Sequence, residues 1–106
     1  MATSKNQSIS TMKSAVLYNS TYGKITLFYN DALKIGFLAV EGSGTTTPSA
    51  QTITRDASSY CKAVGLFVNT CAVANCTIEI DSSGTVKLKL AQGVGWVYGS
   101  VCFAIQ

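Results

Sequence analysis

The sequence predicts an all-β protein, a single-domain β-sandwich or jelly-roll of about seven antiparallel strands. Short apolar segments alternate with turn-forming residues at roughly regular spacing, as in sandwich folds. No segment shows an extended helical period free of glycine and β-branched residues. A chain of 106 residues is long enough for one domain with one core. We expect this domain at 14–106, after a polar tail or linker end at 1–13.

The first half of the domain contains a hairpin signal. A first strand is expected at Ala15–Tyr18, and the segment 23–40 then alternates between apolar and polar residues in two runs. Asn30 and Asp31 lie between these runs, and both residue types tolerate the backbone of a tight turn. We therefore expect a two-residue hairpin turn there.

A long loop follows the hairpin. The segment 41–59 is rich in Gly, Ser and Thr and contains the only proline, and a short strand is expected inside it at 52–55. Two strands rich in Val, Leu, Phe, Ile and Cys are expected next, at 60–72 and 76–80. Residues 74–75 are expected to form the turn between them.

The last third of the chain predicts another hairpin and a final strand. The DSSG segment at 81–84 is a strong turn signal, and the following strand, 85–90, alternates Val and Leu with Thr and Lys. A turn or bulge is expected at 91–95. The last strand is expected at 96–105.

The composition limits the possible partners. Apolar residues make up 47% of the chain and charged residues 12%, about half of the usual share of roughly 25%. The surface is therefore built from neutral polar residues or is partly covered by another chain. The net charge of +3 comes from scattered basic residues, which argues against nucleic acid as a partner. The sequence contains no apolar run of about 20 residues, so we expect no membrane insertion. The N-terminus lacks the pattern of a signal peptide.

The reactive residues do not predict an enzyme. Histidine is absent, which excludes His-based acid–base catalysis. Asp31 and Asp81 lie in predicted turns, where Asp is expected for backbone reasons alone. The four cysteines, Cys61, Cys71, Cys76 and Cys102, lack the short paired spacing of a zinc site. They are either buried free thiols or partners in one or two disulfides. We expect no metal and no cofactor.

Ligand binding is the expected activity, because aromatic and polar residues cluster beside the predicted loops. Tyrosine offers an apolar face and a polar tip, and Asn, Asp and Arg supply hydrogen bonds to a hydroxyl-rich ligand. The expected binding residues are Tyr29, Asn30 and Asp31 at the hairpin turn, and Arg55, Asp56 and Tyr60 along the long loop.

The last strand needs cover on both faces, because apolar or small residues occupy both of its sides. A central position in a monomeric sandwich is one solution. The other, which agrees with the low charge, is an oligomer in which partner chains cover one face. The expected interface residues are Trp96, Tyr98, Val101, Phe103 and Ile105.

The segments GKITLFYNDALKIGFLAVEG (23–42) and GWVYGSVCFAIQ (95–106), after a polar lead-in, resemble the C-terminal head domains of phage or prophage tail-fibre and baseplate receptor-binding proteins. The resemblance is one of layout over about residues 15–106. It implies a homotrimeric β-sandwich at a virion tail tip, or an otherwise extracellular protein, that binds a host-surface carbohydrate or protein. The four cysteines are not expected in that group.

The expected function is therefore a non-enzymatic, host-surface receptor-binding head of a phage tail or baseplate. Two alternatives are a structural virion module that binds only copies of itself or other virion proteins, and a small secreted lectin-like domain stabilised by disulfides.

Overall fold

The computed structural model describes residues 12–21, 23–43, 51–71, 76–91 and 96–106, which form eight strands in two antiparallel sheets. Sheet A has the order β1 (Lys13–Ser20), β2 (Gly23–Asn30), β3 (Ile35–Ser43) and β8 (Trp96–Ala104). Sheet B has the order β4 (Gln51–Asp56), β7 (Thr85–Leu90), β6 (Thr77–Ile80) and β5 (Phe67–Thr70). The predicted all-β sandwich is confirmed.

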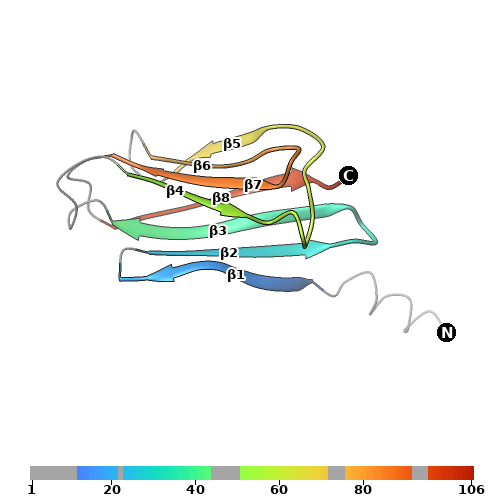
Figure 1. The fold of residues 1–106 in the computed structure, drawn as a ribbon, viewed down its shortest axis with the longest axis horizontal. Coiled ribbons are helices and arrows are strands. Elements are labelled where there is room, and N and C mark those ends of the chain that lie inside the picture. Colours follow the sequence, from blue (N-terminus) through green and yellow to red (C-terminus); the bar gives the residue numbers. More distant parts are fainter. Residues whose placement is uncertain (1–11, 22, 44–50, 72–75, 92–95) are drawn as a thin grey trace.

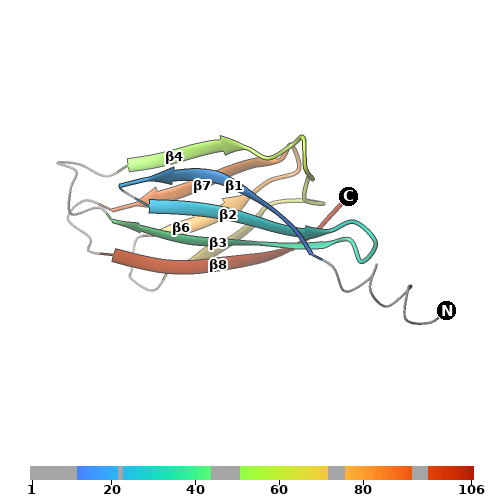
Figure 2. The same ribbon diagram turned by 90° about the horizontal axis from the view of Figure 1, so that it is seen from below.

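The two sheets form two layers whose strands run along the same long axis (Figure 1), and sheet A lies over sheet B when viewed from below (Figure 2). Strands β5, β6 and β7 follow one another as hairpins, and β4 pairs with β7, which is the spatial order of a Greek key. Among the described residues no helix is long and apolar enough to cross a membrane.

The core lies between the sheets because each strand directs alternate side chains inward. Ile25 and Leu38 from sheet A and Ile78 and Leu88 from sheet B are fully buried. Burial of each such side chain contributes roughly 1.5–3 kcal/mol. In β8 the inward residues are Val97, Val101 and Phe103, and they complete the core next to β3.

Two side-chain contacts connect the sheets where their outer strands meet. The guanidinium carbon of Arg55 in β4 lies 4.8 Å from the centre of the Tyr18 ring in β1. On the opposite side, the Asn69 amide of β5 donates a hydrogen bond of 2.7 Å to the Ser100 carbonyl of β8. A cation–π contact and an uncharged amide hydrogen bond therefore link β1 to β4 and β8 to β5.

The first hairpin is longer at its tip than the two-residue turn that Asn30 and Asp31 predict. Asn30 stays in the ladder opposite Ile35, so four residues, 31–34, form the turn. The Asn30 side-chain oxygen accepts a hydrogen bond of 3.0 Å from the Leu33 amide, and Lys34 takes a left-handed φ of 57°. The side chain of Asn30 thus stabilises the turn from a ladder position, and the two-residue prediction was wrong.

The expected strand at 60–72 is also shorter in the structure, where only Phe67–Thr70 forms β5. The preceding residues cross the end of the sandwich, and Ala63 makes an isolated bridge with Ile105. The Val64 amide donates to the Ala104 carbonyl and the Gln106 amide to the Lys62 carbonyl. These bonds extend the edge of sheet A at the C-terminus. The expected turn at 74–75 lies outside the described residues, as does the turn expected at 91–95 apart from Ala91.

The predicted DSSG hairpin is confirmed between β6 and β7. One oxygen of the Asp81 carboxylate accepts hydrogen bonds from the Ser83 amide, the Ser83 hydroxyl and the Thr85 amide. Gly84 has a φ of 83°, and a Cβ atom at this position would lie 2.8 Å from the Ser58 Cα. Both the backbone conformation and the contact with the 57–66 segment therefore require glycine.

Leu38 provides a direct test of the core. Leu38→Ala removes buried methyl groups and leaves a cavity, so the free energy of unfolding is expected to fall by about 2–5 kcal/mol. Leu66 is 64% exposed, and Leu66→Ala is expected to change it by no more than about 0.5 kcal/mol. Urea unfolding at one protein concentration measures both. Equal losses in the two variants would contradict the inward placement of Leu38.

The β6–β7 turn predicts a pH dependence. Hydrogen bonds from the Ser83 side chain and the Thr85 backbone hold the pKa of Asp81 below its ordinary value. Such a group stabilises the fold above about pH 4, and this contribution is lost as the pH falls through the lowered pKa. Asp81→Asn keeps an acceptor oxygen without a titrating charge. Between about pH 4 and pH 2 the wild-type free energy of unfolding should fall more steeply than that of the variant. Parallel curves from urea titrations would refute this.

Candidate functional site

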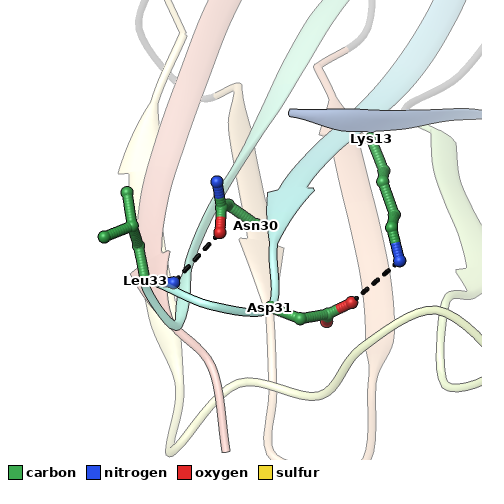
Figure 3. Close-up of polar contacts among 4 residues, drawn as sticks. All are labelled: Lys13, Asn30, Asp31 and Leu33. Atoms are coloured by element: carbon green, nitrogen blue, oxygen red, sulfur yellow. Dashed lines mark hydrogen bonds and ion pairs between the residues drawn. The ribbon is translucent and has the colours of Figure 1, made fainter. Parts of the chain in front are cut away.

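Two tyrosines and an ion pair gather at the end of the sandwich that contains the β2–β3 turn; we call Lys13, Tyr29, Asp31 and Tyr60 the turn-end cluster. The rings of Tyr29 and Tyr60 lie 6.2 Å apart at 51°. The Lys13 ammonium lies 5.8 Å from the centre of the Tyr29 ring. It also lies 3.1 Å from an Asp31 carboxylate oxygen, and Figure 3 shows this ion pair. The cluster therefore combines aromatic surface, a cation and an anion.

The register of the first hairpin positions these groups. Lys13 begins β1 directly opposite Tyr29 in β2, and Asp31 follows at the start of the turn. The 57–66 segment brings Tyr60 to the same end, where its amide donates a hydrogen bond to the Ala57 carbonyl. Three segments that are distant in sequence thus supply the turn-end cluster.

The ion pair of the cluster is open to solvent, with 63% of the Lys13 side chain and 52% of the Asp31 side chain exposed. The hydrogen bond with Asp31 and its negative charge raise the pKa of Lys13, to which Tyr29 also contributes. The lysine is therefore cationic throughout the neutral range. A solvent-exposed pair of this kind adds little to stability and leaves both charged groups accessible to a ligand.

The structure brings three of the six predicted ligand residues together and places the other three in different contacts. Tyr29, Asp31 and Tyr60 belong to the turn-end cluster. Asn30 is adjacent in sequence, but it is only 3% exposed and its side chain bonds to the turn backbone. Its role is structural.

The remaining two predicted ligand residues make their contacts elsewhere. Arg55 lies over the Tyr18 ring and donates a hydrogen bond of 2.7 Å to the Thr54 carbonyl. Asp56 accepts a hydrogen bond of 2.9 Å from the Ser58 amide, and its hydrogen bonds with Ser58 hold its pKa below the ordinary value. Arg55 thus links two edge strands, and Asp56 stabilises the start of the 57–66 segment.

Sequence reasoning missed Lys13, which falls at the end of the expected tail. The structure begins β1 two residues before the expected start of the first strand, and the polar Lys13 and Ser14 carry no local signal for this. The pairing of Lys13 with Tyr29 follows only from the register of β1 on β2.

The five predicted interface residues differ in their exposure. Val101, Phe103 and Ile105 are buried against the chain's own core, whereas Tyr98 is 59% exposed. The side chain of Trp96 lies outside the described part of the structure. The side of β8 that remains uncovered in a single chain carries the alternate residues, which are Tyr98, Ser100, Cys102 and Ala104.

The outer faces of the two sheets differ in chemistry. Register places Thr54, Lys87 and Glu79 in one row across the outer face of sheet B, and Lys89 and Glu79 form an ion pair of 3.2 Å there. The corresponding face of sheet A is mostly uncharged. Its residues, by register, are Ser14, Val16, Asn19, Lys24, Thr26, Phe28, Asn30, Ile35, Phe37, Ala39, Glu41, Tyr98, Ser100, Cys102 and Ala104.

Two hollows border this outer face. An apolar groove with a volume of about 460 Å³ lies near the β2–β3 turn, where Ile35, Phe37 and Cys102 of the outer face meet Phe103 and Phe67 of the core side. A smaller hollow of about 180 Å³ lies near the opposite end, lined by residues that include Lys24, Glu41 and Tyr98. The face is apolar at one end and carries a cation and an anion at the other.

The four cysteines are free thiols in this structure. Burial raises the pKa of Cys61 and of Cys71, which makes them poor nucleophiles at neutral pH. Cys102 is exposed on the outer face of sheet A. Within the described residues, no group of three His, Cys, Asp or Glu side chains is arranged to hold a metal ion.

Comparison of the chain with protein-family models, with curated proteins and with solved structures found no match.

The two neighbouring residues Asn30 and Asp31 are expected to respond differently to substitution. Asn30→Ala removes the acceptor of the Leu33 amide inside the turn and should lower the free energy of unfolding by roughly 1–3 kcal/mol. Asp31→Ala removes an exposed charge and should leave stability close to that of the wild type. Thermal and urea unfolding measures the free energy of unfolding of both variants. If Asp31→Ala lowered this free energy more than Asn30→Ala, then Asp31, and not Asn30, would be the residue that stabilises the turn.

Proposed function

We propose that the protein is a non-enzymatic recognition head that binds a cell-surface saccharide through the turn-end cluster of Lys13, Tyr29, Asp31 and Tyr60. The observation that carries the proposal is the meeting of two tyrosine rings with an exposed ion pair at one end of a rigid sandwich. Binding sites of β-sandwich domains commonly lie on loops at the ends of the sheets.

The chemistry of the cluster suits a saccharide better than a purely apolar or purely charged ligand. A sugar ring presents C–H groups that pack on an aromatic face, and Tyr60 is 44% exposed. Sugar hydroxyls both donate and accept hydrogen bonds, so the Asp31 carboxylate and the Lys13 ammonium complement them. The positions of these groups are set before binding, because β1 and β2 hold Lys13 opposite Tyr29.

The positions of the carboxylates support binding rather than hydrolysis. Asp56 and Asp81 accept backbone hydrogen bonds in turns, and Glu79 pairs with Lys89 on the outer face of sheet B. Asp31 therefore has no second carboxylate among its hydrogen-bond and ion-pair partners. Glycoside hydrolysis requires two carboxyl groups that face each other across the bond to be cleaved.

As an attachment head of a phage tail or baseplate, such a domain would present the turn-end cluster to the host surface. Because Lys13 begins β1, the chain enters the sandwich at the same end as this cluster. The resemblance of layout in the segments 23–42 and 95–106 supports this role. The apolar outer face of sheet A favours the alternative, a purely structural virion module. A binding test separates the two functions.

The test uses an array of immobilised bacterial-surface oligosaccharides, together with adsorption of the protein to intact cells that carry them. The wild type is expected to bind a subset of the glycans. Tyr60→Ala removes the exposed aromatic face and should weaken this binding about tenfold or more, which corresponds to about 1.4 kcal/mol. Asp31→Asn removes the charge and should also weaken it.

Val64→Ala is the matched control, because Val64 is 57% exposed on the same 57–66 segment and lies outside the turn-end cluster. Its binding should equal that of the wild type. Absence of wild-type binding to every glycan and cell type would overturn the recognition function in favour of the structural module. Wild-type binding that survives Tyr60→Ala and Asp31→Asn would place the site elsewhere.

A further inference from the structure

We propose that two copies of the chain pack face to face through the outer face of sheet A, about a two-fold axis that runs along the strands between β2 and β3. The occupant of the uncovered apolar face is thus a second copy of this chain. The proposal depends on the register of sheet A and on the positions of its charges.

The outer face of sheet A has the character of an interface. Phe28 and Phe37 stack at its centre with ring centres 4.7 Å apart, although both lie on the side of the sheet away from the core. Val16 and Ile35 on the same face are 55% and 48% exposed. Large apolar side chains that gather on one outer face of a small soluble domain mark a contact site.

Register makes the face complementary to itself. In a two-fold dimer with its axis between β2 and β3, each residue of β2 faces the residue of the partner's β3 that is its own ladder neighbour. Phe28 then faces Phe37 of the partner subunit, and Thr26 faces Ala39 of the partner subunit. Lys24 faces Glu41 of the partner subunit, and the second pair follows by symmetry.

The charges choose this axis over the alternative. The ion pairs of the described residues join Lys13 to Asp31 and Lys89 to Glu79, and neither includes Lys24 or Glu41. An axis across the strands would bury the charged row of Lys24 and Glu41 against the apolar row at the other end of the face. The axis along the strands instead places each of these charges against a charge of opposite sign in the partner subunit, in addition to its ladder neighbour in its own chain.

The area of the face reaches the size that a specific interface needs. Four strands about 4.8 Å apart and eight residues of about 3.3 Å each cover roughly 500 Å² in plan. Two such faces bury about 1,000 Å² in total, which is the lower limit for a specific contact. Packing of aligned sheets at about 10 Å matches the arrangement already present between sheets A and B.

The chosen axis has a consequence for binding that rests on the proposed function. Rotation about an axis parallel to the strands leaves both β2–β3 turns at the same end of the dimer. The two turn-end clusters would then face the same surface and bind it bivalently, which raises apparent affinity without new contacts.

The first experiment measures the mass of the protein in solution by light scattering behind a sizing column. The wild type is expected at two chains of 11.2 kDa each. Ala39→Lys places a charge at the centre of the outer face of sheet A and should give one chain. Val68→Lys is the control, because Val68 is an exposed residue on the outer face of sheet B, opposite Glu79. It should remain dimeric.

A charge-exchange experiment tests the axis itself. Lys24→Glu alone gives a face with two acids and Glu41→Lys alone gives a face with two bases, so each variant should be monomeric. An equal mixture should form a heterodimer, because every acid then faces a base. The like charges within each variant chain are the same before and after mixing, so association on mixing reports only the contact between chains. Circular dichroism of each variant checks that it is folded.

The exposed thiol of Cys102 supplies an independent measurement. In the dimer it faces Ser14 of the partner subunit, so its reaction with a thiol reagent should be slow in the wild type and fast in Ala39→Lys. Cys61, Cys71 and Cys76 are buried and should be unreactive in both.

Three results would overturn the proposal. A wild-type mass of one chain at high concentration removes the dimer, and a mass of three chains replaces the two-fold contact with the trimer expected from the sequence. A dimeric wild type whose two charge variants do not associate on mixing contradicts the axis. None of these results depends on glycan binding, so failure of the proposed function is distinguishable.

Discussion

The antiparallel pairing of β3 with β8 is the contact on which the rest of the structure depends. It extends from Ile35 opposite Ala104 to Ser43 opposite Trp96 and places the end of the chain beside the first hairpin. Because side chains alternate along a strand, this register decides at once which β8 residues enter the core and which remain outside. A shift of one residue would bury Tyr98 and Cys102 and expose Val101 and Phe103.

One glycine of that pairing makes room for an aromatic ring. Gly36 lies opposite Phe103, and a Cβ atom there would be 2.7 Å from the Phe103 ring. The aromatic ring therefore occupies the space above the glycine and contacts Phe67 of sheet B, with ring centres 6.4 Å apart. This packing joins the two sheets beside β8 and forms one wall of the apolar groove.

The same alternation produces two different outer faces and one functional end. Sheet B exposes threonine, lysine and glutamate to water, as expected for a solvated surface. Sheet A exposes stacked aromatic rings and small neutral residues, and its low charge accounts for part of the unusual composition of the whole chain. The turn-end cluster lies at the end of the strands rather than on either face, so self-association through sheet A and ligand binding at the turn are geometrically compatible.

The fold class was predictable from the sequence because its signal is local. Period-two alternation in segments such as 85–90, and turn chemistry such as that of Asp81 and Gly84, depend only on neighbouring residues. Where a longer-range contact competed with local preference, prediction failed. Asn30 was assigned to a turn because its residue type favours turns, yet pairing with Ile35 keeps it in the ladder. The segment 60–72 reads as one strand, yet bonds to the C-terminus divide it.

Composition and local pattern alone predict an all-β sandwich and exclude histidine chemistry. Only the tertiary structure decided that Lys13 meets Tyr29 and Asp31, that Tyr60 joins them, and that Val101 and Phe103 point inward while Tyr98 points outward. The physical reason is that strand register and the packing of two sheets are set by contacts between residues far apart in the chain. Local propensity carries no information about which of these distant residues will face one another.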